Sequence, residues 1–165
     1  MADTPDPAES MPAEGETAPD FTLADQHGGE VSLAGLRGSW VVLYFYPRAD
    51  TPGCTTQACG IRDRSSEYEA AGARVLGVSP DESEEIAKFD DKYGLGFTLL
   101  ADPDHSVAEL YGAWGEKSMY GKKYTGVLRS TVLIDPEGKV ARVFPKVQPK
   151  KHDDLVLKAL AELQG

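Results

Sequence analysis

Apolar residues along the chain form short continuous runs that alternate with stretches at helical spacing. The runs predict buried strands, of which the longest extends from Trp40 to Tyr46. Further strands are predicted at 74–79, 97–101, 127–134 and 139–144. Helical spacing predicts helices at 52–71, 81–92, 104–111 and 152–163. Strands that alternate with helices predict an α/β domain.

Turn residues divide the chain between these elements. The polar, glycine-rich segment 25–29 separates 21–23 from 30–33 and predicts a hairpin. The segment 135–138, Asp-Pro-Glu-Gly, predicts a turn between the last two strands.

Two segments carry predictions about particular side chains. Residues 112–126 are predicted as a long loop, in which Trp114, Tyr120 and Tyr124 belong either to a functional lid or to ordinary packing. In the C-terminal helix, Leu155, Leu160 and Leu163 are predicted to share one face.

The first 16 residues are rich in proline, acidic residues and alanine, with almost no apolar bulk. Such a composition cannot bury enough apolar surface to fold, which predicts a disordered acidic tail over 1–17 and a domain over 18–165.

Charge and cysteine count exclude several classes of protein. The chain has 17 Lys and Arg against 27 Asp and Glu, a formal net charge of -10, which argues against nucleic acid or an anionic membrane as partner. No apolar run has the length of a membrane span, and no signal peptide is recognisable. Two cysteines are too few for a secreted disulfide scaffold, so a cytoplasmic location is predicted.

Both cysteines, Cys54 and Cys59, lie just after the longest apolar run. Pro47 is expected to end that strand because proline donates no ladder hydrogen bond. Thr51 and Pro52 predict a helix start, with a hydroxyl cap followed by proline at the first helical position. Cys54 therefore falls in the first helical turn.

This position favours a reactive cysteine, although a buried, inert cysteine is the alternative. The thiolate is the nucleophilic form of the side chain, and the positive end of a helix dipole stabilises a negative charge by roughly 0.3–1 kcal/mol, up to about 2 kcal/mol when partly buried. That is a modest gain, so a cation from elsewhere in the chain is expected nearby.

The segment PRADTPGC has a Pro-x-x-x-Thr-x-x-Cys pattern and resembles the active site of the peroxiredoxins. The second cysteine five positions later, in CTTQACGIRD, resembles the peroxiredoxin Q subfamily, also called bacterioferritin comigratory protein. The resemblance extends from about residue 18 to the end and includes VLGVSPDE, KYGLGFTLLAD and RSTVLID.

The resemblance implies a thioredoxin fold with peroxiredoxin insertions: an N-terminal hairpin and a central mixed sheet flanked by helices. It also implies a thiol peroxidase that reduces hydrogen peroxide and organic hydroperoxides, with Cys54 as the peroxidatic cysteine and Cys59 as the resolving cysteine. Thr51 would orient the peroxide and Pro47 would help exclude water. Neither a cofactor nor a metal is implied, the expected reductant is thioredoxin or a similar dithiol, and a monomer is expected.

The resemblance also supplies the missing cation, because it marks Arg129 as the active-site arginine beside Cys54. Arg129 is predicted to lie within the apolar strand 127–134, where a charge is costly without a partner. The alternative is an ordinary surface arginine on an alternating strand.

Other classes fit the residues less well. A thioredoxin-like oxidoreductase would show C-x-x-C, whereas four residues separate these cysteines. A metal site would need more ligands, because His27, His105 and His152 lie far from the cysteines and from one another. A holdase or redox-sensing protein that uses the disulfide as a switch stays open as the non-enzymatic alternative.

The spacing of the cysteines also has a geometric consequence. Residues five apart on a regular helix have Cα atoms about 8.6 Å apart, whereas a disulfide needs roughly 4.4–6.8 Å. A bond between Cys54 and Cys59 therefore predicts that the helix from Pro52 to about Asp63 unwinds in each catalytic cycle.

Overall fold

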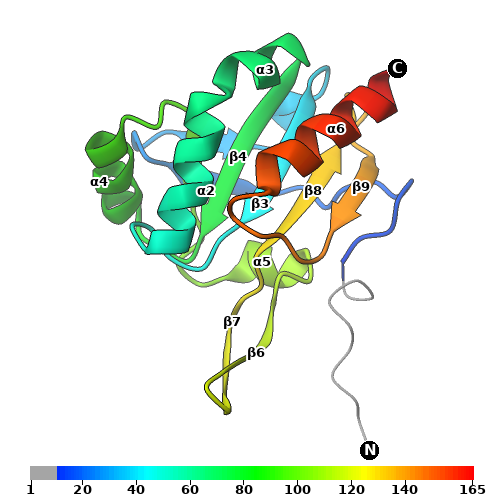
Figure 1. The fold of residues 1–165 in the computed structure, drawn as a ribbon. Helices are drawn as coiled ribbons and strands as arrows, with labels where there is room; N and C mark the ends of the chain where they lie inside the picture. The colour runs from blue at the N-terminus through cyan, green and yellow to red at the C-terminus, as the bar shows by residue number, and fades with distance from the viewer. Residues whose placement is uncertain (1–10) are drawn as a thin grey trace, which may run out of the picture.

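The computed structural model describes residues 11–165. A seven-stranded sheet with the strand order β2-β1-β5-β4-β3-β8-β9 forms its centre (Figure 1). The strands are β1 Thr22–Asp25, β2 Glu30–Ser32, β3 Trp40–Phe45, β4 Ala73–Ser79, β5 Thr98–Ala101, β8 Ser130–Ile134 and β9 Val140–Phe144. The central strand β3 pairs in parallel with β4 and antiparallel with β8, which makes the sheet mixed.

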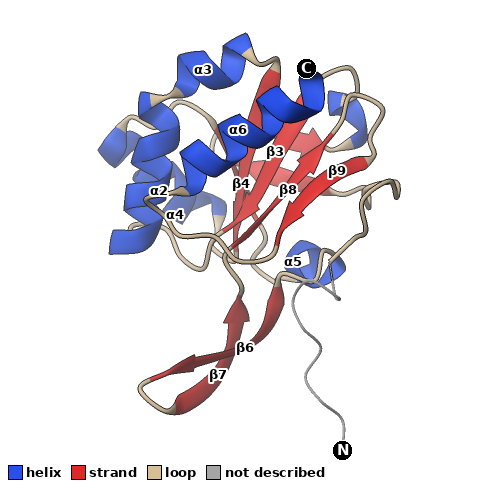
Figure 2. Cartoon of the chain, turned by 45° about the vertical axis from the view of Figure 1, so that its right-hand side comes forward, coloured by secondary structure: helices blue, strands red, loops and turns tan. Residues whose placement is uncertain are grey.

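Helices cover both faces of this sheet (Figure 2). They are the 3-10 helix η1 Ala34–Leu36 and the α-helices α2 Pro52–Asp63, α3 Ser65–Ala70, α4 Ser83–Tyr93, α5 Ser106–Leu110 and α6 His152–Gln164. Along β3, Leu43 and Phe45 pack into the core on the α5 side, whereas Val42 and Tyr44 pack into the core beneath α2, α4 and α6. Burial on both faces explains why this strand is a continuous apolar run. The α/β prediction and the N-terminal hairpin of β1 and β2 are confirmed.

The helix predicted at 52–71 is in fact two helices. Arg64 separates α2 from α3 with non-helical torsion angles, φ -110° and ψ 19°. The side chain of Arg64 is also engaged outside α2, because its Nη1 donates to Asp154 Oδ1 on α6 at 2.6 Å. The break therefore coincides with a tertiary contact and has no glycine or proline signal in the sequence.

The long loop predicted at 112–126 is wrong, because most of it is a β-hairpin. Strands β6 Trp114–Met119 and β7 Lys122–Val127 pair antiparallel and form a separate two-stranded sheet. Tyr120 and Gly121 turn the chain with φ of 52° and 78°, as a type I′ turn requires. The strands carry few apolar residues, so hydrophobic periodicity gives no signal there.

The strand predicted at 127–134 is also shorter than expected, since β8 begins at Ser130. Arg129 is therefore not within a strand. The preceding backbone is used elsewhere: Leu128 N donates to Ala113 O at 2.7 Å, and Arg129 O accepts from Val147 N at 3.2 Å.

The predicted boundary between tail and domain at residue 18 lies too late in the chain. Met11 is buried, and the backbone around it runs along β9, because Gly15 N donates to Val140 O and Val140 N donates to Glu16 O, both at 2.8 Å. The rest of the predicted tail, residues 1–10, lies outside the described residues.

The apolar face predicted for the C-terminal helix is partly wrong. Leu155 is 43 % exposed, whereas Val156, Ala159 and Leu160 form the buried face of α6. Within residues 11–165, no helix has the length and apolar character needed to cross a membrane.

His152, the first residue of α6, is fully buried beside the sheet. Its Nε2 lies 2.8 Å from Thr131 Oγ1 of β8, and its ring packs on Tyr44 with centroids 5.5 Å apart. Burial, with a smaller effect of the Arg129 charge, lowers the pKa of His152 to about 4. The imidazole is therefore neutral in the folded protein.

This buried histidine predicts a loss of stability in acid. The unfolded chain protonates His152 near its ordinary pKa of about 6.5, so between pH 6.5 and 4 the unfolded state binds more protons and the free energy of unfolding falls. The loss amounts to at most about 3 kcal/mol over that range. Thermal unfolding of His152→Gln should show lower stability at pH 7 but a flatter dependence between pH 6.5 and 4. Parallel pH profiles for the two proteins would contradict the assignment.

Candidate active site

Side chains from the ends of β4 and α4 hold the loop between β3 and α2. Ala49 N donates to Asp81 Oδ2 at 2.8 Å, at the end of β4. Asp50 accepts from Lys92 Nζ at 2.8 Å and from Tyr93 Oη at 2.7 Å, both at the end of α4. These contacts place the N-terminus of α2 at the carboxyl ends of the parallel strands β3 and β4.

The predicted helix start is confirmed, but the predicted hydroxyl cap is wrong. Thr51 is the N-cap residue with an extended backbone, and Pro52 occupies the first helical position. The Thr51 hydroxyl does not cap the helix and instead donates to Arg48 O at 3.0 Å. Cys54 lies in the first turn as predicted, where it is buried with 1 % of its surface exposed.

Arg129 reaches this buried thiol from a segment 75 residues further along the chain. Its Nη2 donates to Cys54 Sγ at 3.3 Å, and its Nη1 donates to Gln57 Oε1 at 2.6 Å. A guanidinium stays charged and presents several N–H groups in a rigid plane, so it can hold a thiolate and a second acceptor together. The structure thus brings together the cysteine and the cation that the sequence resemblance paired.

Gln57 is a site residue that the sequence reasoning missed. It is buried with 1 % exposure, one turn after Cys54 on the same face of α2, and it fixes the orientation of Arg129. The Cys-x-x-Gln spacing on a predicted helix is the signal that could have found it. Its Nε2 has no hydrogen-bond partner among the described residues.

Two other predicted residues, Pro47 and Thr51, lie on the loop that precedes α2. Pro47 follows Tyr46, whose N–H makes the last ladder bond of β3 to Val78 O at 3.0 Å. Pro47 and Thr51 are both half-buried on the loop that leads into α2. Their roles toward a peroxide stay predictions.

Cys59 is half-buried on α2, and both thiols are free. The helix is continuous from Pro52 to Asp63, so no break between the cysteines brings them closer. A regular helix places their Cα atoms about 8.6 Å apart. The geometric premise for unwinding therefore holds.

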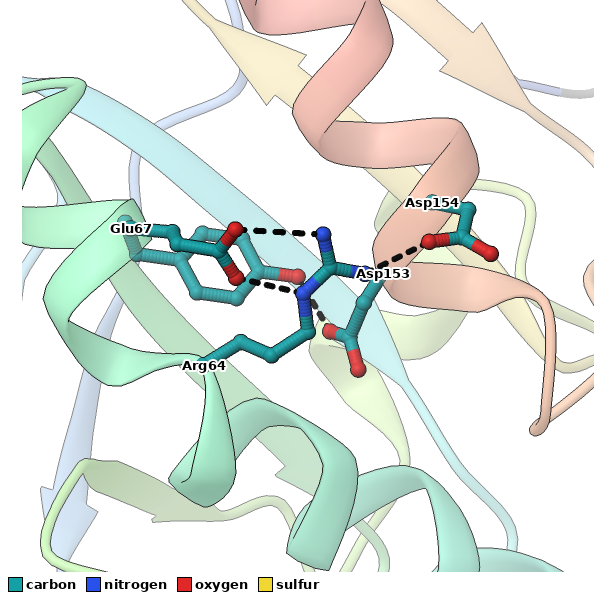
Figure 3. A network of polar contacts seen from close by, with 5 residues as sticks. Arg64, Glu67, Asp153 and Asp154 are labelled. Atoms are coloured by element: carbon teal, nitrogen blue, oxygen red, sulfur yellow. Dashed lines mark hydrogen bonds and ion pairs between the residues drawn. The ribbon is translucent and has the colours of Figure 1, made fainter.

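A polar network anchors the chain just beyond α2 to the start of α6 (Figure 3). Arg64 forms ion pairs with Glu67 and Asp154, and the Tyr68 hydroxyl donates to the Asp153 carboxylate. The other Asp153 oxygen lies against Gly60, where an added Cβ would come within 2.6 Å of it. Burial raises the pKa of the Asp153 carboxyl. A side chain at position 60 would therefore force the Asp153 carboxylate to move.

A groove leads from the surface to Arg129. It has a volume of about 770 Å³ and lies between β6 and the segment after β9, with a lining of Glu116, Lys117, Ser118, Leu128, Arg129, Pro145, Lys146 and Val147. The groove gives a small substrate access to the guanidinium that contacts Cys54.

The alternative of a metal site gains no support from the geometry. Among residues 11–165, no group of three or more His, Cys, Asp or Glu side chains is arranged to hold a metal ion. His105 instead stacks on Trp114 with ring centroids 3.7 Å apart, and His152 is buried against Thr131.

A mixed sheet with a cysteine at a helix N-terminus and an arginine on its sulfur defines a thiol-based redox protein. Residues 15–143 match the AhpC/TSA family. Peroxiredoxin Bcp of Escherichia coli strain K12 is 49 % identical over 148 residues, which cover 90 % of this chain and 95 % of that protein.

Solved structures agree with the sequence comparison. A structure of Xanthomonas campestris peroxiredoxin Q has a TM-score of 0.81 and 39 % identity, and covers 86 % of this chain and 90 % of that one. The bacterioferritin comigratory protein of the same organism, described with its alkyl peroxide reduction activity, has a TM-score of 0.84 and 36 % identity, with coverage of 91 % and 98 %. The chain belongs to the AhpC/TSA family, in its peroxiredoxin Q group, and it is a thiol peroxidase with a thioredoxin fold.

The contacts of Arg129 predict a graded loss of activity. Arg129→Met should slow consumption of the first equivalent of peroxide by at least about tenfold, because it removes a charge-assisted contact from a buried group. Gln57→Leu keeps the guanidinium but frees one of its N–H groups, so a smaller loss is expected. Arg129→Lys should recover little of the lost rate, because lysine lacks the planar fork of the guanidinium. Stopped-flow measurement of the first turnover ranks the rates of the wild type and the three variants. Equal rates in all four proteins would contradict the prediction.

Proposed function

We propose that Cys54 is the peroxidatic residue of this thiol peroxidase and that Cys59 resolves it. The observation that carries the proposal is the contact of 3.3 Å between Arg129 Nη2 and Cys54 Sγ in the first turn of α2. Arg129 and the helix N-terminus both favour negative charge on this sulfur, and the groove that ends at Arg129 gives a peroxide access.

The first step is attack of the Cys54 thiolate on one peroxide oxygen. The O–O bond breaks, the sulfur becomes a sulfenic acid, and the other oxygen leaves with negative charge and takes a proton to form water or an alcohol. Arg129 and the N–H groups of the first helical turn lie where they stabilise that charge, as an oxyanion hole does. Thr51 orients the peroxide, and Pro47 presents no N–H and helps exclude water.

The second step forms the disulfide. The Cys59 thiol attacks the sulfenic sulfur, an S–S bond forms and water is released. Two thiolates of a dithiol reductant then reopen the bond by exchange, which leaves the reductant oxidised. Thioredoxin or a similar dithiol is the proposed reductant, and both hydrogen peroxide and organic hydroperoxides are proposed substrates. Alkyl peroxide reduction by the related Xanthomonas protein supports the organic substrates.

We also propose that the protein acts as a monomer in the cytoplasm. Four large apolar side chains of the described residues are exposed, Leu110, Tyr120, Tyr124 and Leu155, on different elements, which is fewer than an obligate interface needs. A cycle that returns both cysteines to free thiols suits a reducing compartment.

The assignment of the two cysteines predicts different products from their variants. Cys54→Ser should abolish turnover with thioredoxin, thioredoxin reductase and NADPH. Cys59→Ser should still consume about one equivalent of peroxide and accumulate sulfenic acid, detectable by mass or with a dimedone probe.

Either of two results would overturn this scheme. Full turnover in Cys54→Ser would exclude it as the peroxidatic residue. A wild-type protein that forms the disulfide once but does not turn over with any dithiol would be a redox switch and not an enzyme.

Formation of the disulfide predicts that α2 unwinds. Amide hydrogen exchange over residues 52–63 should be faster in the oxidised protein than in the reduced one, because the helical hydrogen bonds are lost. Helix α3, which lies beyond the break at Arg64, serves as the internal control and should be equally protected in both states.

The disulfide must be confirmed by mass in the same samples. Equal protection of residues 52–63 in the two redox states, with the bond present, would refute the unwinding.

A further inference from the structure

Only the base of the β6–β7 hairpin packs on the rest of the described protein. Trp114 stacks on His105 with an angle of 5° between the rings, and Val127 is buried in the core beside α5. The remainder of the hairpin extends away from the main sheet, as both views show (Figures 1 and 2). Stability of the fold therefore does not account for its outer part, residues 118–125.

The tip of the hairpin carries a residue that local preferences do not explain. Tyr120 has a φ of 52° and is 97 % exposed. The left-handed region costs a residue with a side chain roughly 1–2 kcal/mol, and asparagine or glycine is preferred at this position of a type I′ turn. Tyr120 gains no burial in exchange. Such an outlier points to a role outside folding.

Cationic side chains cluster where the hairpin meets α2, the helix that carries both cysteines. The groove of about 770 Å³ is lined by Lys117, Arg129 and Lys146, and a neighbouring hollow of about 400 Å³ at Pro52 and Gly53 is lined by Lys150. The carboxylate in the lining of these two hollows, Glu116, pairs with Lys123 at 3.4 Å. This face is positive on a protein whose net charge is -10.

The positive charge on this face is balanced only in part, because Glu116 pairs with Lys123 alone among these cations. Burial, together with repulsion from Arg129, lowers the pKa of Lys117. An anionic partner would relieve this repulsion. Lys122 and Lys123 add two cations near the tip of the hairpin, beyond the groove. Their side chains lie on opposite faces of β7, with Lys122 on the face of Lys117 and Lys123 on the face of Glu116.

We propose that the tip of the hairpin and the adjoining rim of the groove, with Lys117, Tyr120, Lys122, Lys123 and Lys146, bind an acidic protein reductant of the dithiol type; this region is here called the docking arm. The proposal rests on the proposed function, in which such a reductant reopens the Cys54–Cys59 disulfide. A small peroxide or a small dithiol fits the groove at Arg129 but cannot contact the tip at the same time. A protein spans both, and exposed aromatic and cationic side chains favour an acidic protein surface.

The chemistry that follows docking is thiol–disulfide exchange. One reductant thiolate attacks a sulfur of the disulfide, which releases the other protein sulfur as a thiolate and leaves a mixed disulfide. The second reductant thiolate then breaks the mixed bond, so that the reductant leaves oxidised and both cysteines are reduced. Lys117 and Lys146 line the groove at Arg129, whose guanidinium contacts Cys54 on α2, so this end of the docking arm would hold the reductant near the unwound segment.

The test compares a protein reductant with a small neutral one. Lys122→Glu/Lys123→Glu should lower kcat/KM for an acidic thioredoxin, with its reductase and NADPH, by about tenfold or more, because steering and complementarity are reversed. Turnover with dithiothreitol and consumption of the first equivalent of peroxide should be unchanged. The exposed Glu116–Lys123 pair contributes little to stability, so the hairpin should persist.

A matched control and a second variant separate docking from structure. Lys139→Glu/Lys158→Glu changes the net charge equally, at the opposite end of the sheet and on α6, and should leave thioredoxin kinetics intact. Tyr120→Asn suits the turn and should not lower thermal stability, yet it should raise KM for thioredoxin. Added salt should lower kcat/KM for thioredoxin but not for dithiothreitol.

Three outcomes would overturn the docking arm: unchanged thioredoxin kinetics in Lys122→Glu/Lys123→Glu, an equal loss with thioredoxin and dithiothreitol, or a loss confined to anionic organic hydroperoxides. The last would make this face a substrate site. Absence of wild-type turnover with dithiothreitol would instead refute the proposed function, and the docking arm with it.

Discussion

The contact between the Arg129 guanidinium and the buried sulfur of Cys54 is the interaction on which the site depends. A sulfur that is 1 % exposed is poorly solvated, and burial alone favours the uncharged, unreactive thiol. The cation at 3.3 Å and the helix N-terminus both place positive charge beside this sulfur, where water is largely excluded. Burial then strengthens each electrostatic contact that stabilises a leaving oxygen. This guanidinium distinguishes Cys54 from an inert buried cysteine, which was the alternative interpretation of the sequence.

Much of the fold serves to hold Arg129 in place. Its backbone lies between β7 and β8, where Leu128 N bonds to Ala113 O and Arg129 O accepts from Val147 N. Its side chain is oriented by Gln57, which α2 presents on the same face as Cys54. The hairpin, the edge of β8 and the segment after β9 thus converge on one side chain. This convergence explains why the groove to the active site is bounded by those same segments.

Local sequence signals were sufficient to predict the start of α2 but not the structure of the segments around it. Pro47 and Pro52 constrain the backbone directly, so the end of β3 and the position of Cys54 in the first turn could be predicted. The partnership with Arg129 came from the resemblance, because no pattern links residues 75 positions apart. The β6–β7 hairpin could not be predicted because its exposed strands lack apolar alternation. The helix break at Arg64 could not be predicted because a tertiary ion pair, and no local sequence signal, accompanies it. Met11 was assigned to a tail because only its burial against the folded domain identifies it as part of the core.

The proposed disulfide requires α2 to hold Cys54 against Arg129 in the reduced protein and to unwind in the oxidised one. Gly60 serves both requirements, because a side chain there would displace the Asp153 carboxylate that bonds to Tyr68. A glycine weakens a helix by about 1 kcal/mol relative to alanine, so the packing that excludes a side chain also lowers the cost of unwinding. The Tyr68–Asp153 bond and the Arg64–Asp154 ion pair join the chain beyond α2 to α6 (Figure 3). Both contacts lie outside Pro52–Asp63 and can survive when that segment unwinds. The break at Arg64 would therefore give the proposed unwinding a fixed end, and the loss of structure would stay within the helix that carries both cysteines.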